Sequence, residues 1–254
     1  IYGFHRGTEG VAIPTLVSRI VAAVVIMVLL MRKNQLLYLK IDRHFRPNWS
    51  MIGKILSVGI PNGLENSMFQ LGKVLVLSLV STFGTYAIAA NAVSNTISLF
   101  SILPGMAICL AVTTVISRCV GAGDYEQAKY YNRKLILITH GCMAVTVAIV
   151  FAMIPVLLRA YNLSDAASEA TRHILWFHGV CAVLTWPESF VLPATFRAAG
   201  DAKACMIIAT VSMWIFRVGF SYFLGKTLGW GVFGVWVAMI IDWEFRILCF
   251  AIRY

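Results

Sequence analysis

Residues 86–117, YAIAANAVSNTISLFSILPGMAICLAVTTVIS, contain no charged side chain and decide how the chain folds. About 20 mostly apolar residues are enough to cross the hydrocarbon core of a membrane as a helix. Unpaired backbone groups are costly in lipid and barrel strands alternate in polarity, so this run predicts a transmembrane helix. Six further runs share its character: 11–31, 54–81, 134–158, 173–197, 204–224 and 229–250. The sequence therefore predicts an all-α fold, a polytopic transmembrane helix bundle of about seven spans.

The composition of the 254 residues supports a membrane protein, since 59% are hydrophobic and only 13% are charged. A soluble domain is typically about 45–50% apolar and about 25% charged, so a soluble fold is disfavoured. The basic residues behind the net charge of +10 gather in alternate connections, as they do in cytoplasmic loops. The six cysteines form no Cys-X-X-Cys pair, which disfavours a metal site or a disulfide framework. We predict a multi-pass protein of the cell membrane, of the bacterial inner membrane type, with no nucleic-acid partner.

The longest connection, residues 32–53, is basic and amphipathic, and it is expected to lie along the cytoplasmic lipid headgroups. A plain solvated linker is the alternative. In either case it forms the natural boundary between residues 1–31 and residues 54–254. The chain starts at Ile1 without an initiator Met and stops as a helix emerges, so we expect it to be a piece of a longer protein.

Two short connections share one kind of turn. They are Gly121-Ala122-Gly123-Asp124 and Ala198-Ala199-Gly200-Asp201. Asp124 is expected to cap the helix that follows, with Gln127 in the position of a capping-box partner. The second turn is expected to repeat this device at Asp201.

One face of the run 54–81 is polar although the run lies at bilayer depth. At about 3.6 residues per turn, this face gathers Asn62, Glu65, Asn66, Phe69, Gln70 and Lys73. A charge at bilayer depth costs at least about 2.5–3.5 kcal/mol, so it usually faces a cavity or a partner. Glu65 is therefore predicted to be the ionisable group of a cavity wall that Asn62, Asn66 and Gln70 help to form. The alternative is a structural seam in which Glu65 pairs with Lys73 or bonds to Asn66.

A second polar face lies in the run 86–117. Its members are Asn91, Ser94, Asn95 and Ser98. These side chains can line the same cavity as Glu65 or can hydrogen-bond a neighbouring helix, and both interpretations stay open. Asn91 is kept as a candidate site residue.

Glu188 is the second candidate carboxylate. Pro187 and Pro193 interrupt its span, and backbone carbonyls freed beside a carboxylate form a plausible site for a cation or a proton. The alternative is a glutamate near a wet helix end, because Arg197 follows closely in the sequence.

Asp242 and Arg246 are four residues apart and are expected to form an intrahelical ion pair. Arg217 and Arg19 are expected to find acidic partners on neighbouring helices, which the sequence does not identify. The sequence contains no nucleophile–base motif, no metal-ligand spacing and no Gly-rich nucleotide loop. We therefore predict neither catalysis nor a bound organic cofactor.

Several motifs, taken in their order and spacing, resemble the second half of a multidrug and toxic compound extrusion (MATE) transporter. They are Gly59-Ile60-Pro61 with Glu65, the stretch 81–91, Pro104-Gly105, Gly121-Ala122-Gly123-Asp124 and the stretch 231–236. The resemblance implies that residues 1–31 hold the sixth helix, 32–53 the interlobe linker, and 54–254 the C-terminal six-helix lobe. It also implies that Glu65 matches the family's functional carboxylate, and that Glu188 is a looser match to an acidic residue of the tenth helix.

The leading hypothesis is a cation-coupled multidrug efflux antiporter that exports organic cations in exchange for Na⁺ or H⁺. The coupling ion and the drug would compete for Glu65, helped by Glu188, and Na⁺ at either carboxylate is the only metal considered. The expected partners are cationic small-molecule drugs, the lipid bilayer and the missing N-terminal lobe. Phe69, Trp186 and Trp214 are candidates for stacking on a flat cation.

Three alternatives stay open. A lipid-linked oligosaccharide flippase of the same broad superfamily would need a basic cavity for pyrophosphate, with Lys73, Arg19 and Arg217 as the residues to examine. A membrane-embedded enzyme using Glu188 or Asp242 is disfavoured, because no nucleophile–base pair or metal-ligand set is present. The last alternative is that the chain is inactive without its missing lobe.

Overall fold

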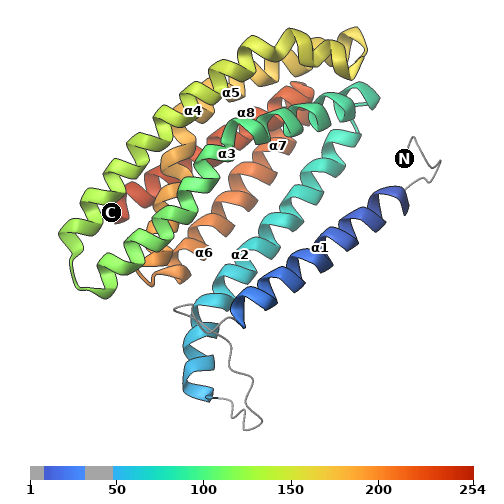
Figure 1. The fold of residues 1–254 in the computed structure, drawn as a ribbon. Coiled ribbons are helices and arrows are strands. Elements are labelled where there is room, and N and C mark those ends of the chain that lie inside the picture. The colour runs from blue at the N-terminus through green and yellow to red at the C-terminus, as the bar shows by residue number, and fades with distance from the viewer. Residues whose placement is uncertain (1–8, 32–47) are drawn as a thin grey trace. The chain divides into compact units, whose positions relative to one another are not determined.

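The computed structural model describes residues 9–31 and 48–254, and the regular structure of these residues is helical throughout (Figure 1). The elements are α1 (Glu9–Leu30), α2 (Trp49–Ser81), α3 (Thr85–Gly121), α4 (Tyr125–Tyr161), α5 (Asp165–Ala198), α6 (Ala202–Ser212), η1 (Met213–Gly219), α7 (Phe220–Tyr222), η2 (Phe223–Thr227) and α8 (Gly231–Arg253). The segments η1 and η2 are π-helical turns within the sixth predicted span. The predicted all-α fold is confirmed.

The chain forms two compact units, Ile1–Ile52 and Gly53–Tyr254. In the first unit, the described side chains of α1 are exposed and mostly apolar. Most of the predicted basic connection lies outside the described residues. Its last part is helical, because Asn48 Oδ1 accepts a hydrogen bond of 3.2 Å from the Met51 N–H and α2 begins at Trp49. The roles predicted for the segments on either side of this connection stay predictions.

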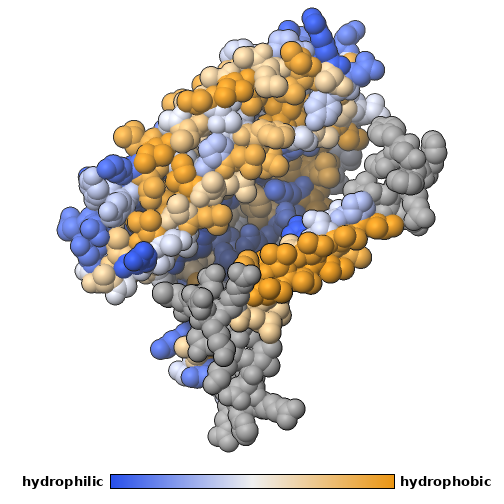
Figure 2. Space-filling view, in the orientation of Figure 1, coloured by the Kyte–Doolittle hydropathy of each residue, from blue (hydrophilic) through white to orange (hydrophobic). Residues whose placement is uncertain are grey.

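Among the residues that the structure describes, four helical segments are long and apolar enough to cross a membrane by themselves, namely α3, α4, α5 and Ala202–Thr227. The helices α2 and α8 carry charged side chains along their length, among them Glu65 and Lys73 in α2 and Asp242 and Arg246 in α8. Apolar residues cover the flanks of the long helices and hydrophilic residues gather at their ends (Figure 2). This distribution is the one expected of helices that are surrounded by lipid.

The helix α4 begins at Tyr125, well before the apolar run that starts at residue 134. As predicted, Asp124 caps the helix, because its side chain accepts a hydrogen bond of 2.9 Å from the Gln127 N–H. The reciprocal bond of a capping box does not form, since the Asp124 N–H donates to the Cys119 carbonyl at 3.0 Å. A good cap therefore extends the helix into a charged first turn that hydropathy alone does not assign.

The prediction that Asp201 repeats this cap is wrong. Its side chain makes no capping bond to α6, and its Oδ2 accepts a hydrogen bond of 2.7 Å from Nε of Arg253. A bond between two ionised groups is about twice as strong as a neutral one, so the carboxylate turns toward the arginine. The contact links the start of α6 to the end of α8.

The second unit is held together by α3, α4, α5 and α8, because α3 packs against both α4 and α5, and α5 packs against α8. Trp186 of α5 lies in this core, with only 3% of its surface exposed. Its ring stacks on Phe190 with 4.7 Å between the ring centroids, and it lies against Gly105 of α3. Trp186 is therefore a packing residue, and the prediction that it stacks on a cation is wrong.

Replacing Gly105 by Ala should destabilise the protein by about 1–3 kcal/mol, because the added methyl group overpacks the core. A Cβ atom on Gly105 would lie 2.3 Å from Cζ3 of Trp186. Gly141→Ala is the matched control, since nothing lies within 4 Å of its Cβ position. There the gain in helix propensity, about 0.5–1 kcal/mol, should dominate. Thermal unfolding of the purified protein in detergent measures both variants, and equal shifts would contradict this packing argument.

The helix α2 joins the core at its C-terminal end, where Leu79 and Val80 are buried. Toward the N-terminus of α2, two cavities lie between this helix and the segments α3, α5, α6, η1 and α8. The polar face of α2 lines these cavities, and this arrangement positions the candidate site.

Candidate substrate and cation site

Glu65 of α2 is held by an arginine from α5. Nη1 of Arg197 lies 3.1 Å from Oε1 and 3.2 Å from Oε2 of Glu65. The side chains of Glu65 and Arg197 are 17% and 29% exposed, so the ion pair is only partly shielded from solvent. The carboxylate therefore pairs with neither Lys73 nor Asn66, although a structural polar seam along α2 would have required one of these two partners.

The Glu65 cavity is a space of about 170 Å³ whose lining includes Asn62, Glu65, Asn66, Phe69, Arg197 and Arg246. The carboxyl group is thus neither sealed between helices nor turned toward lipid. The structure brings Glu65 together with Asn62 and Asn66, and the Asn66 side chain donates a hydrogen bond of 2.9 Å to the Asn62 carbonyl. Gln70 is exposed and lines neither this cavity nor the next one, so its role beside Glu65 stays a prediction.

The Lys73 cavity is a second space of about 210 Å³, and its lining includes Lys73, Asn91, Asn95, Arg217, Trp236 and Met239. Asn91 therefore faces α2 but not the Glu65 cavity. Its Oδ1 accepts hydrogen bonds of 3.1 Å from Nε1 of Trp236 and 3.1 Å from Nδ2 of Asn95. Asn91 thus lines a cavity and bonds a neighbouring helix, whereas the hydroxyls of Ser94 and Ser98 are buried without a hydrogen-bond partner among the described residues.

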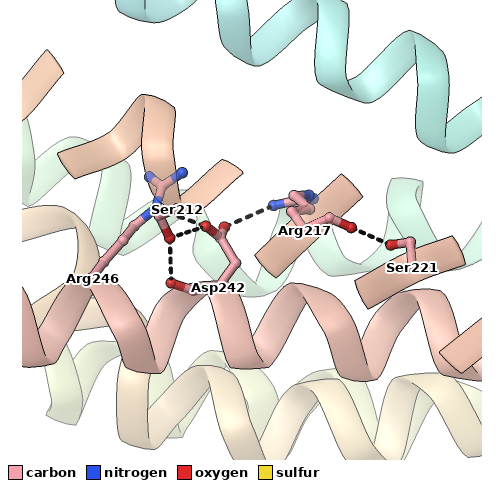
Figure 3. Close-up of polar contacts among 5 residues, drawn as sticks. All are labelled: Ser212, Arg217, Ser221, Asp242 and Arg246. Atoms are coloured by element: carbon pink, nitrogen blue, oxygen red, sulfur yellow. Dashed lines mark hydrogen bonds and ion pairs between the residues drawn. The ribbon is translucent and has the colours of Figure 1, made fainter. Parts of the chain in front are cut away.

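A buried charge cluster, the Asp242 cluster, consists of Asp242, Arg246, Arg217 and Ser212 (Figure 3). Asp242 has no exposed surface, and Nε of Arg246 lies 3.2 Å from its Oδ1, so the predicted ion pair is confirmed. Nη1 of Arg217 lies 3.8 Å from the other carboxylate oxygen, and the Ser212 hydroxyl donates to Oδ1. Because Arg246 lines the Glu65 cavity and Arg217 lines the Lys73 cavity, the cluster connects the two.

The backbone that carries Arg217 is irregular. This residue lies in the π-helical turn η1, and the Ser221 hydroxyl donates to the Arg217 carbonyl (Figure 3). The same carbonyl also accepts a hydrogen bond from the Phe220 N–H at the end of η1. Turns of this kind are rare and often occur at functional sites.

Phe69 lies beneath three of the protein's own cations. The distances to its ring centroid are 4.9 Å from Nζ of Lys73, 5.4 Å from Cζ of Arg217 and 5.7 Å from Cζ of Arg246. A transported cation that stacks on this ring would have to compete with these side chains.

Glu188 lies apart from both cavities and contacts α4 instead. Its Oε1 is 2.7 Å from Nε2 of His140, and Nδ1 of the same ring is 2.7 Å from the Val183 carbonyl oxygen. The structure therefore does not bring Glu188 and Glu65 into one site. The only sequence signal for His140 is a titratable side chain inside the apolar run 134–158.

Apolar helices that are long enough to span a membrane surround two polar cavities and a buried charge cluster. These features define a multi-pass membrane protein whose charged side chains gather inside its helix bundle. The chain belongs to the MatE family, whose model matches residues 61–223. The resemblance seen in the sequence is therefore confirmed.

The chain is similar to proteins from several bacteria and to solved transporter structures. It is 26% identical over 246 residues to the uncharacterized transporter YisQ of Bacillus subtilis, covering 95% of this chain and 53% of that protein. It is also 26% identical over 247 residues to the probable multidrug resistance protein NorM of Thermotoga maritima, covering 96% and 52%. The chain thus spans about half the length of the curated relatives it matches.

Two solved structures share the fold. An outward-facing multidrug resistance MATE family transporter of the MOP superfamily superposes with a TM-score of 0.84 at 21% identity, covering 99% of this chain and 56% of that one. A MOP superfamily transporter from Pyrococcus furiosus superposes with a TM-score of 0.85 at 23% identity, with the same coverage of 99% and 56%. At this level of identity the likeness concerns the arrangement of the helices.

Proposed function

We propose that this chain forms half of a multidrug efflux transporter, which exports organic cations across the cell membrane in exchange for protons. Family membership and the relatives named multidrug resistance proteins support transport rather than catalysis. The observation that carries the proposal is the carboxylate of Glu65, which lines a cavity and is held by a partly exposed arginine.

The Glu65–Arg197 pair offers a simple route to exchange. The guanidinium of Arg197 is a cation tethered beside the carboxylate, so an incoming organic cation can take its place without leaving Glu65 unpaired. An unpaired charge in the membrane is costly, but the displaced guanidinium of Arg197 is 29% exposed, so water can stabilise its charge. A proton that later binds Glu65 neutralises the carboxylate and releases the cargo. Because one site cannot hold both cations, transport of the two becomes coupled.

The His140–Glu188 pair supports H⁺ rather than Na⁺ as the coupling ion. A carbonyl oxygen only accepts hydrogen bonds, so the contact of 2.7 Å with Val183 requires a proton on Nδ1 of His140. The contact of 2.7 Å between Nε2 and Glu188 then requires another shared proton. Both contacts are therefore satisfied when Nδ1 carries one proton and another proton lies between Nε2 and the carboxylate.

Uptake of ethidium into inverted membrane vesicles that carry the complete gene product containing this chain tests the proposal. A pH gradient with an acidic lumen should drive uptake, and a Na⁺ gradient at equal pH should not. His140→Gln should lower the proton-driven rate by about tenfold or more, because it removes a charge-assisted hydrogen bond. His173→Gln, at an exposed histidine of α5, is the matched control and should leave the rate unchanged.

Three results would count against the proposal. Absence of gradient-driven uptake would contradict export itself. Uptake driven by Na⁺ alone would contradict proton coupling, and so would a full rate in His140→Gln.

One observation favours a second candidate, the translocation of a lipid-linked oligosaccharide. Such a cargo needs a basic cavity for its pyrophosphate, and Lys73 and Arg217 line one cavity. Among the residues that the structure describes, no acidic side chain lines this cavity with them.

A further inference from the structure

The polar interior of this lobe has an excess of positive charge around the Lys73 cavity. Arg217 and Arg246 share the single carboxylate of Asp242. Lys73 adds a third cation over the same Phe69 ring and, within residues 9–31 and 48–254, makes no ion pair. Three formal positive charges thus face one negative charge.

Some charged groups of the Asp242 cluster also lack a hydrogen-bond partner. The distance of 3.8 Å between Nη1 of Arg217 and Oδ2 of Asp242 is too long for a hydrogen bond. Nη2 of Arg246 and Oδ2 of Asp242 are both buried and have no hydrogen-bond partner among the described residues. The side chains of Arg217 and Arg246 are only 13% and 5% exposed, so water does little to stabilise their charges.

The Lys73 cavity is lined by several donors and by the amide of Asn95, and no acidic group of the described residues lines it. The indole N–H of Trp236 can only donate, so Oδ1 of Asn91 faces it and the amide nitrogen of Asn91 is left as a further donor. Lys73 supplies a point charge with three donors, and Arg217 supplies a planar fork, which are the two side-chain types that bind phosphate groups. A volume of about 210 Å³ accommodates such a group but not a whole amphipathic drug.

We propose that the Lys73 cavity binds a phosphate-type oxyanion, which Lys73 and Arg217 contact and which the Asn91 amide orients. The oxyanion is either a phosphate group of the transported molecule or the headgroup of an anionic lipid. It supplies the negative charge that the Asp242 cluster lacks. The proposal goes beyond organic cation export and does not depend on the coupling ion.

Binding to the purified complete gene product in a neutral detergent tests this site in two arms. Equilibrium dialysis with radiolabelled inorganic pyrophosphate measures binding of a free anion. Native mass spectrometry with phosphatidylglycerol, against phosphatidylcholine, measures binding of a lipid headgroup. Lys73→Gln is compared with Lys54→Gln, which removes one charge from an exposed position of the same helix. Lys73→Arg keeps the charge.

We expect saturable binding in at least one arm for the unchanged protein, for Lys54→Gln and for Lys73→Arg. Lys73→Gln should bind about tenfold more weakly or worse, as expected on loss of one charge-assisted bond. Binding of phosphatidylglycerol alone assigns the site to lipid, and binding of pyrophosphate alone assigns it to cargo. Either outcome supports the proposal.

Equal affinities of Lys73→Gln and Lys54→Gln would overturn the proposal. The absence of saturable binding in both arms would also overturn the proposal. That result would follow if an acidic group outside the described residues neutralises Lys73. Ethidium uptake with no anion binding would refute this site alone. Anion binding with no ethidium uptake would refute cation export and leave the site standing.

Discussion

Glu65→Gln is expected to abolish resistance to organic cations in an efflux-deficient host, down to the level of cells without the transporter. Glutamine has the size and the hydrogen-bonding carbonyl of glutamate but not its charge. Arg197, now without a counter-charge, would also repel an incoming cation from the Glu65 cavity. Loss of a charge-assisted contact weakens binding by about tenfold or more, and loss of the titrating group removes exchange as well.

The measurement is the growth-inhibitory concentration of ethidium, together with the amount of protein in the membrane. Glu126→Gln is the matched control, since the Glu126 side chain is 88% exposed and pairs with Lys129 on the surface of α4. It should leave resistance unchanged. Normal resistance in Glu65→Gln at normal membrane abundance would defeat the assignment of Glu65.

Asp242→Asn should destabilise the protein by about 3–5 kcal/mol, the usual cost of removing one partner from a buried ion pair. The substitution keeps the shape of the side chain but leaves Arg246 and Arg217 without their shared counter-charge. Both arginines and Asp242 are almost fully enclosed, so solvent cannot take over this role. Thermal or denaturant unfolding of the purified protein in detergent measures the loss.

The matched control is Asp201→Asn. Asp201 pairs with Arg253 at 2.6 Å, but the two side chains are 32% and 49% exposed, so the expected cost is about 1 kcal/mol or less. A double variant with Asp242→Asn and Arg246→Gln should lose less stability than the sum of the two single variants. Equal losses in Asp242→Asn and Asp201→Asn would contradict the role given to the Asp242 cluster.

Contacts within one helix could be predicted from the sequence. The ion pair of Asp242 and Arg246 and the cap at Asp124 both join residues three or four positions apart, where helix geometry alone brings side chains together. The cap at Asp201 was predicted wrongly because Arg253, from another helix, competes for the same carboxylate. Local rules therefore hold until a distant charged residue reaches the group.

The partners of the two candidate carboxylates could not be predicted. Arg197 is 132 positions from Glu65, and His140 is 48 positions from Glu188. Within this second unit, the rotation of each helix about its axis selects these pairs, and hydropathy does not specify that rotation. The polar stripe on α2 was visible in the sequence, but its division between two cavities was not.

The amino-acid sequence by itself determined that this chain is helical and crosses a membrane, because apolar length and backbone hydrogen bonding in lipid leave few other solutions. It also identified Glu65 as the acidic residue to examine. Only the tertiary structure decided that this carboxylate meets Arg197, that Glu188 meets His140, and that Lys73 and Arg217 line one cavity. The physical reason is that hydropathy is summed along one helix, whereas charge pairing depends on side chains that converge from several helices.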